Sequence, residues 1–385
     1  MRIKSFYQYL IFICFFIFIH QKMNSQNPFS LNGYVTEMPS YSWMNFAGVK
    51  MDFKDNLIHN RLNFSYTPSS KLFLAAEFRN RFICGETMKM IPDYADNLNK
   101  DNGLMDLSFN VVSGKNYVLN VMLDRLWAEY ILGSFQIRVG RQRINWGQSM
   151  VWNPNDIFNA YSYFDFDYLE KPGIDGLRLQ YYTGNASLIE GVMKLDHNNI
   201  LTAAGRYRFN VVGYDFQFLG GWFNDKEWML GAGWSGDVMD AGFYGECSWF
   251  IPKDKDLDQS LISSVGANYT FSNSLFIQGE ILYSSNLKNP GDFFDFYYKQ
   301  SDVKSLSLTE WTWFASASYP VTPLLNASFS IMGFPDINSY YLGPGIDYSL
   351  LNNLTASLIL QYFGGTPNNT KSESIFGFFR LKYNF

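Results

Sequence analysis

The sequence predicts an all-β fold, a transmembrane antiparallel β-barrel of about 16–18 strands with long extracellular loops. Apolar and polar residues alternate with period two along most of the chain, in about 18 segments. Each segment has about 9–13 residues, enough for a tilted strand to cross a bilayer, whereas strands of soluble proteins have about 5–6. Short turns alternate with longer polar connections, the longest at 37–55, 83–117, 145–171 and 286–306. Transmembrane barrels show this pattern, with short turns at one rim and longer loops at the other.

The alternating segments carry one apolar face and one polar face. In 71–82, for example, Phe78 lies on one face and Glu77 on the other. On a transmembrane barrel the apolar face contacts lipid and the polar face lines the lumen. The last segment, 374–385, alternates in the same way and ends on Phe385. It resembles the closing strand of bacterial outer-membrane proteins, and this resemblance implies that the barrel-insertion machinery binds it.

The N-terminus has the pattern of a secretory signal peptide, which we place at residues 1–26. Arg2 and Lys4 precede the apolar run 10–19, which is too short to span a membrane as a helix. Residues 27–385 are then expected to form one domain, a single transmembrane β-barrel. Its predicted location is the outer membrane of a Gram-negative bacterium, in contact with outer-membrane lipid.

Composition argues against several functions. The net charge is −5 and no basic stripe is visible, so nucleic-acid binding is not predicted. Cys84 and Cys247 have neither metal nor redox spacing, and no cofactor or metal site is predicted. His59 and His197 are isolated and lack the spacing of a metalloprotease or a catalytic triad. We therefore predict no enzymatic activity.

The segment 145–171 is long, aromatic and acidic. A loop of this length is usually functional or disordered, and its aromatic content argues against disorder. We predict an ordered loop that folds into the lumen and narrows it, with polar groups toward the pore. The alternative, an aromatic vestibule that stays outside the lumen, remains open. The residues predicted to form the constriction are Trp146, Trp152, Asp156, Asp165, Asp167 and Glu170.

Three motifs border this loop: GRQ-x3-WG at 140–147, NPxD at 153–156 and EKPGxD at 170–175. The set resembles one in bacterial outer-membrane porin-like barrels, which include alginate-export-type and related uncharacterised porins. The resemblance is specific only across about 135–180. It implies a monomeric or loosely assembled channel of about 16 or 18 strands with an undefined solute. In general porins the third outward loop folds into the lumen, and 145–171 is the third by our strand assignment.

Arginine is unevenly distributed, because all but one of the arginines in 27–385 lie between Arg61 and Arg208. Most of them fall on the polar face, where rings of arginine favour anions. They could equally pair with wall carboxylates such as Glu190, and the two interpretations are compatible. Arg141 and Arg143 break the alternation, mark the strand end or a bulge, and could tie the loop by pairing with Asp165, Asp167 or Glu170. The predicted pore-lining residues are Arg79, Arg81, Arg125, Glu129, Arg138, Arg178, Arg206 and Arg208.

The predicted function is a porin-like channel for the passive passage of small polar or anionic solutes. One alternative is an outer-membrane binding, export or surface-interaction barrel whose pore is closed by 83–117 and 145–171. A third hypothesis is an outer-membrane hydrolase that uses His59 or His197. Single-channel conductance separates the first two hypotheses, and the effect of histidine substitution on lipid hydrolysis tests the third.

Overall fold

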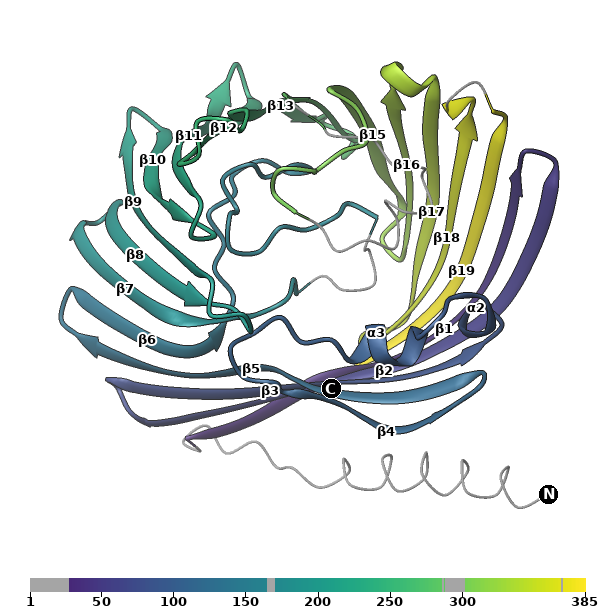
Figure 1. Cartoon of the computed structure of the whole chain (residues 1–385), viewed down its shortest axis with the longest axis horizontal. Coiled ribbons are helices and arrows are strands. Elements are labelled where there is room, and N and C mark those ends of the chain that lie inside the picture. The colour runs from purple at the N-terminus through teal and green to yellow at the C-terminus, as the bar shows by residue number, and fades with distance from the viewer. Residues whose placement is uncertain (1–27, 165–169, 286, 288–301, 368–369) are drawn as a thin grey trace.

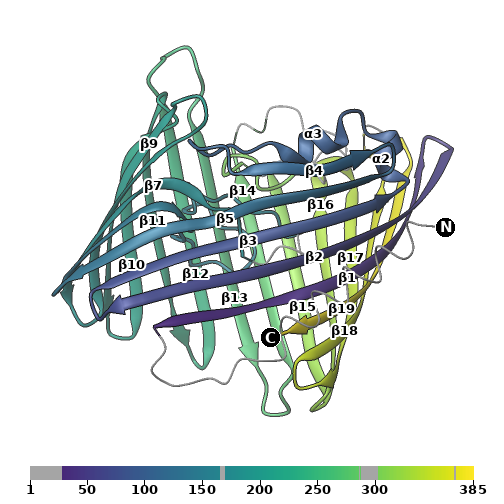
Figure 2. The same ribbon diagram turned by 90° about the horizontal axis from the view of Figure 1, so that it is seen from below.

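The computed structural model describes residues 28–164, 170–285, 287, 302–367 and 370–385. The described strands form one antiparallel sheet. The sheet closes on itself because β1 (Phe29–Phe46) pairs with β2 (Val49–Ser69) on one side and with β19 (Ser372–Asn384) on the other. Figures 1 and 2 show the resulting barrel along and across its axis.

Eighteen strands make the closed ring, and this confirms the predicted fold class. The additional strand, β4 (Ser108–Gly114), pairs with the part of β5 that begins at Tyr117 and therefore extends the wall beyond the end of β6. The remaining strands are β3 (Leu72–Gly85), β5 (Tyr117–Leu132), β6 (Phe135–Gln142), β7 (Ile174–Gly184), β8 (Ser187–Leu195), β9 (Leu201–Val211), β10 (Tyr214–Phe223), β11 (Glu227–Val238), β12 (Ala241–Pro252), β13 (Ser260–Thr270), β14 (Phe276–Ser284), β15 (Trp311–Thr322), β16 (Leu325–Phe334), β17 (Ser339–Leu351) and β18 (Leu354–Gly365).

Helices are short and lie in the connections. They are α2 (Thr87–Met90), α3 (Tyr94–Asn99) and the 3-10 turn η1 (Pro335–Ile337). Among the described residues, no helix is long and apolar enough to cross a membrane. The helices α2 and α3 both fall in the connection from β3 to β4.

The outer face of the barrel is apolar and the inner face is polar, the reverse of a soluble protein. In β8, Ile189 is 50% exposed while its neighbour Glu190 is 1% exposed. In β14, Ile281 is 53% exposed while Glu280 is 2% exposed. Exposed aliphatic residues beside buried carboxylates are expected where lipid surrounds the barrel and polar groups line the lumen.

The two rims differ in the length of their connections. Most turns on the rim that holds both described chain ends have two residues, as at 133–134 between β5 and β6. The opposite rim carries the three long connections, at 86–116, 143–173 and 285–310.

The long connection predicted at 37–55 is wrong. There β1 and β2 continue to the tight turn at Ala47 and Gly48, both of which have positive φ, as hairpin turns of this kind require. The alternation in this stretch is inverted in part, since Met44 and Phe53 face inward and are buried while Asp52 and Lys54 are exposed. These strand ends therefore resemble a polar loop in sequence.

A hydrophobic core lies inside the barrel rather than between two layers. The chain between β6 and β7 leaves the wall and crosses the interior (Figure 1). Its apolar side chains pack against inward-facing residues of the wall toward the rim with the long connections. The cluster includes Trp146, Trp152, Ile157, Phe158, Phe164, Phe250, Phe314, Phe334, Phe363 and Phe376.

Candidate functional site

We call residues 143–173 the inner loop; its described parts are 143–164 and 170–173. The inner loop leaves the wall because the backbone of β6 turns at Gly140, where φ is +114°. A Cβ at this position would lie 2.2 Å from the carbonyl oxygen of Leu126, so only glycine fits. After Gly140 the alternation is broken, and the consecutive residues Arg141 and Gln142 are both buried. The predicted break in the alternation therefore falls at the end of β6.

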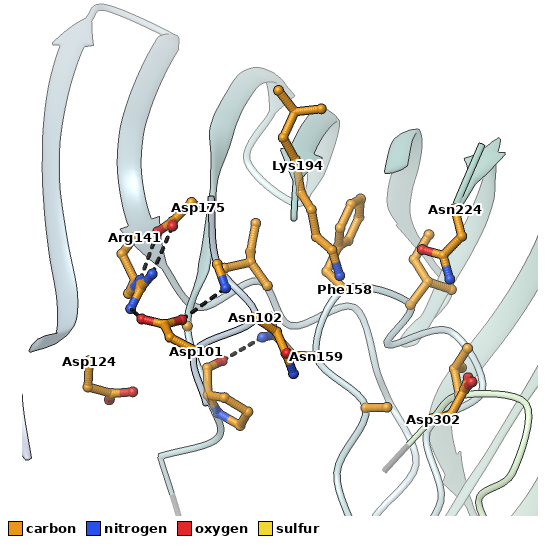
Figure 3. Close-up of a pocket in the computed structure, with 18 of the residues that line it drawn as sticks. Asp101, Asn102, Asp124, Arg141, Phe158, Asn159, Asp175, Lys194, Asn224 and Asp302 are labelled. Carbon is orange, nitrogen blue, oxygen red and sulfur yellow. Dashed lines mark hydrogen bonds and ion pairs between the residues drawn. The ribbon is translucent and has the colours of Figure 1, made fainter. Parts of the chain in front are cut away.

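Arg141 joins the ends of β6 and β7 to the connection that precedes β4 (Figure 3). Its Nε and Nη2 donate to the two carboxylate oxygens of Asp175, both at 2.8 Å, in the two-pronged geometry that suits a guanidinium. Its Nη1 donates to Asp101 at 2.6 Å and its Nη2 donates to the Met105 carbonyl oxygen at 2.6 Å. Gly103 lies against this cluster, and a Cβ there would lie 2.1 Å from Arg141 Nη2. Arg141 and Asp175 are register partners, which explains why Arg141 does not pair with Glu170 as one hypothesis proposed.

The three sequence motifs meet at the base of the inner loop. Asp156 accepts a hydrogen bond from the backbone N–H of Trp146 at 3.3 Å and pairs with Lys171 at 2.9 Å. Burial raises the pKa of Asp156, while Lys171 and the N–H of Trp146 lower it. Asn159 accepts from the N–H of Ile144 at 3.0 Å and donates to the Pro172 carbonyl oxygen at 2.5 Å. The motifs thus connect the outgoing and returning ends of the loop.

Two wall carboxylates, Glu246 on β12 and Glu280 on β14, bind the backbone of the inner loop; we call them the anchor carboxylates. The N–H groups of Gln148, Ser149 and Asn155 donate to Glu246, the last two at 2.6 Å and 2.9 Å. The N–H groups of Val151 and Trp152 donate to Glu280 at 3.0 Å and 2.8 Å. Both carboxylates are buried. Hydrogen bonds to ionised groups are stronger than neutral ones, each contributing about 1.5–3 kcal/mol.

Polar side chains reinforce this attachment. Ser264 donates to the Trp152 carbonyl oxygen at 3.1 Å, and its hydroxyl lies 2.9 Å from that of Ser149. Gln217 donates to the Trp146 carbonyl oxygen at 2.7 Å. Asn155 accepts from Ser248 at 2.8 Å and donates to the wall backbone. The loop is therefore bonded to five neighbouring strands, β10 to β14.

Aromatic rings of the inner loop pack on both sides of the lumen. Trp146 meets Phe158 edge-on at 5.0 Å between centroids, and the guanidinium of Arg206 lies 5.3 Å from the Trp146 ring. On the far side, Tyr163 meets Phe314 at 4.9 Å, and Phe164 meets Tyr341 at 5.1 Å. Edge-to-face pairs of this kind each contribute about 0.5–1.5 kcal/mol beyond burial. Trp152 is also buried, 6.3 Å from Phe314.

A row of charges across β5 to β9 contains four of the predicted pore-lining residues together with Glu190. Arg138 pairs with Glu129 at 2.6 Å, and Glu190 pairs with both Arg178 and Arg206 at 2.7 Å. Arg138 and Arg178 face each other directly on β6 and β7. The row holds three guanidinium groups and two carboxylates, so it keeps a surplus of one positive charge.

The other predicted pore-lining residues are bound less uniformly. Arg125 pairs with Asp124 at 2.8 Å and donates to the Glu170 carbonyl oxygen at 2.8 Å, so it holds the returning end of the inner loop. Arg81 donates to Asn120 at 2.8 Å, and Arg79 is buried. Arg208 is half-buried on the same face of β9 as Arg206.

The predicted loop acids have different partners from those expected. Asp156 pairs with Lys171 of the loop itself rather than with an arginine of the wall. The Glu170 carboxylate accepts from the hydroxyl of Tyr34 at 3.2 Å. Asp165 and Asp167 lie outside the residues that the structure describes.

The two histidines lie in different surroundings. His59 is 2% exposed, in the middle of β2, with its ring 5.4 Å from that of Tyr34. His197 is exposed in the connection between β8 and β9 and contacts Asn198 at 2.9 Å. Over the described part of the chain, no group of three or more histidine, cysteine or acidic residues is placed to hold a metal ion.

Sequence reasoning missed the anchor carboxylates and the partners of Arg141. Glu246 and Glu280 stand on the inner face of otherwise uncharged strand segments, which was the available signal. The alternation of apolar and polar residues assigns a residue to one face of the sheet, but it does not identify the residue that contacts it in the folded barrel. Asp101 was missed because nothing in the sequence places the connection before β4 beside β6 and β7.

Comparison with known proteins shows which solved structures have a similar fold. No family model matches the sequence, and no curated protein matches it. Among solved structures, it is similar to OccK11 (OpdR) of Pseudomonas aeruginosa at 8% identity and a TM-score of 0.57, covering 92% of this chain and 96% of that one. It is similar to OccK3 (OpdO) of the same organism at 9% identity and a TM-score of 0.56, covering 92% and 96%. It is also similar to the P. aeruginosa outer membrane protein OpdK at 12% identity and a TM-score of 0.54, covering 92% and 99%.

The barrel therefore has the fold of bacterial porin-like proteins. At identities this low the similarity concerns the fold alone. The resemblance of the motif set to alginate-export-type barrels stays a prediction.

Proposed function

We propose that the chain is an outer-membrane channel for the passive passage of small polar solutes, with a lumen that the inner loop narrows. The observation that carries the proposal is the anchoring of the loop, in which five backbone N–H groups bind Glu246 and Glu280. Barrels of about 16–18 strands otherwise leave a wide aqueous channel. The loop is therefore the element that would set the size of the aperture.

The charge row supports a weak preference for anions. Its surplus positive charge lies on the lumen face, where a narrow, low-dielectric wall lets the field persist. The exposed acidic residues of the long connections lie in bulk solvent, where salt screens them beyond about 8–10 Å. Most arginines are paired, so we expect the preference to be smaller than an unpaired arginine wall would produce.

Single-channel recording in planar lipid bilayers tests the proposal. The purified wild-type protein should give discrete conductance steps, since a narrowed lumen still conducts ions. Folded protein that inserts into the bilayer without any conductance would contradict the channel function.

A second candidate is a barrel that is closed in its resting state and serves in binding or surface interaction. It is favoured by the buried aromatic cluster inside the lumen, in which Trp146, Trp152 and Phe164 are each 5% exposed or less. If this candidate is right, the wild-type protein should show no conductance, and a variant without the anchor carboxylates should conduct.

Export and membrane assembly are part of the proposal. Residues 1–26, the expected signal peptide, lie outside the described residues. Phe385 at the chain end exchanges two backbone hydrogen bonds with Gly33, both at 3.0 Å, which supports a role of the last strand in closing the barrel. Deletion of Phe385 should lower the amount of protein in the outer-membrane fraction, and an unchanged amount would argue against recognition of this strand.

A further inference from the structure

A cavity of about 400 Å³ lies between the inner loop and the wall, near the rim with the long connections (Figure 3). Its volume is within the range of small-molecule sites, about 300–1,000 Å³. The buried side chains of Phe158, Phe223 and Ile174 form its apolar part. The exposed residues Lys100 and Asp302 lie at its opening to solvent.

Most charged groups around the cavity are already compensated. Arg141 is bound by Asp101 and Asp175, and Asp124 pairs with Arg125 at 2.8 Å. These groups stabilise the wall and have little capacity left for a ligand.

Lys194 and Asp302, which have opposite charges, are not compensated by such close ion pairs among the described residues. The side chain of Lys194, from the end of β8, reaches into the cavity beside Phe158 (Figure 3). Across the part of the chain that the structure describes, no carboxylate lies within 4.0 Å of its ammonium group, and Asp302 has no cation within that distance. The charges of Asp196 and Asp302 nevertheless act on Lys194. Asn224 accepts from Thr202 at 3.0 Å, which leaves its amide N–H groups for the cavity.

We propose that this cavity binds a small zwitterion, an α-amino acid with an apolar side chain. The ligand carboxylate pairs with Lys194 and the amide of Asn224, the ligand ammonium pairs with Asp302, and the side chain packs on Phe158 and Phe223. Lys194 is half-buried and Asp302 is exposed at the opening, so a partner for Lys194 contributes more, and a ligand with a single charge would pair with only one of the two. A zwitterion pairs with both charges. The apolar part of the cavity favours a ligand side chain larger than that of glycine, because such a side chain packs against Phe158 and Phe223.

The inference rests on the proposed function in one respect, because a channel solute would enter by this rim. The test is independent of conduction: equilibrium binding to the purified barrel in detergent, measured by saturation-transfer NMR. The three probes share the isobutyl group of leucine: L-leucine, 4-methylpentanoate, which lacks the ammonium group, and 3-methylbutylamine, which lacks the carboxylate. L-leucine should bind about tenfold more tightly than either analogue, which corresponds to about one charged hydrogen bond.

Two variants locate the site, and each has a matched control. Lys194→Gln and Asp302→Asn should each weaken L-leucine binding about tenfold. Lys255→Gln and Asp256→Asn remove the same charges from the exposed connection between β12 and β13 and should leave binding unchanged. The proposal is overturned if Asp302→Asn strengthens binding and 4-methylpentanoate binds as well as L-leucine, because the cavity would then be an anion site. It is also overturned if none of the probes binds to protein that conducts normally, a result that leaves the channel function intact.

Discussion

The lumen wall has two parts that balance their buried charges in different ways. From β5 to β9, arginines and carboxylates of the wall pair with one another, as in the row that ends at Arg206. From β12 to β18, the inner face is mostly uncharged and carries buried hydroxyls such as those of Ser264 and Ser330. The anchor carboxylates are exceptions there, and backbone N–H groups of the inner loop are their partners. The first part is complete without the loop, whereas the second part needs the loop to satisfy its charges.

The double variant Glu246→Gln/Glu280→Gln should have the largest effect on this difference. A glutamine amide has one accepting oxygen where the carboxylate has two, and its own N–H groups oppose those of the loop. We expect the inner loop to detach and the single-channel conductance to rise severalfold. Glu310→Gln, an exposed residue at the same rim, is the matched control and should conduct as wild type. A double variant with wild-type conductance would show that the aromatic contacts alone hold the loop.

Arg141→Lys should have the next largest effect, on the free energy of unfolding. Lysine keeps the charge but cannot reproduce the two-pronged contact with Asp175 or reach Asp101 at the same time. Disrupting a buried ion pair costs about 3–5 kcal/mol, and unfolding in denaturant from lipid vesicles measures the loss. Arg380→Lys, whose partner Asp347 is 3.5 Å away and more exposed, should cost less than about 1 kcal/mol. Equal losses for the two variants would mean that the Arg141 cluster does not stabilise the wall.

Substitutions in the charge row should have a smaller effect, on ion selectivity. The triple variant Arg138→Gln/Arg178→Gln/Arg206→Gln leaves Glu129 and Glu190 unpaired and changes the row from a surplus of one positive charge to two negative charges. The reversal potential under a salt gradient should therefore move from weak anion preference to cation preference. A triple variant with the wild-type reversal potential would place the permeation path away from this row.

Arg208→Gln should give the smallest shift, in the same direction. It removes one positive charge from the lumen face without leaving a carboxylate of the row unpaired. The same reversal-potential measurement detects it, and a shift as large as that of the triple variant would mean that Arg208 dominates selectivity.

The alternation of apolar and polar residues was sufficient to predict the barrel and the face on which most arginines lie. Lipid and lumen impose opposite polarity on neighbouring residues of a strand. The composition of 145–171 similarly predicted an ordered loop. The attachment of that loop could not be predicted, since Gln148 and Glu246 are 98 residues apart, Val151 and Glu280 are 129 residues apart, and each pair meets only after the barrel closes. The prediction for 37–55 was wrong for another reason: exposed polar residues such as Asp52 and Lys54 interrupt the apolar outer face near the rim, and the strand resembles a loop in sequence.

The most direct test of the central claim, that the anchor carboxylates hold the inner loop inside the lumen, is a reversible tether. Ser149→Cys and Ser264→Cys place two thiols where hydroxyls now lie 2.9 Å apart, close enough for a disulfide, in a background with Cys84 and Cys247 replaced by alanine. The tether is added to Glu246→Gln/Glu280→Gln and single-channel conductance is recorded before and after reduction. The account predicts wild-type conductance in the oxidised state and a severalfold increase on reduction. High conductance in both states, with the disulfide formed, would contradict it.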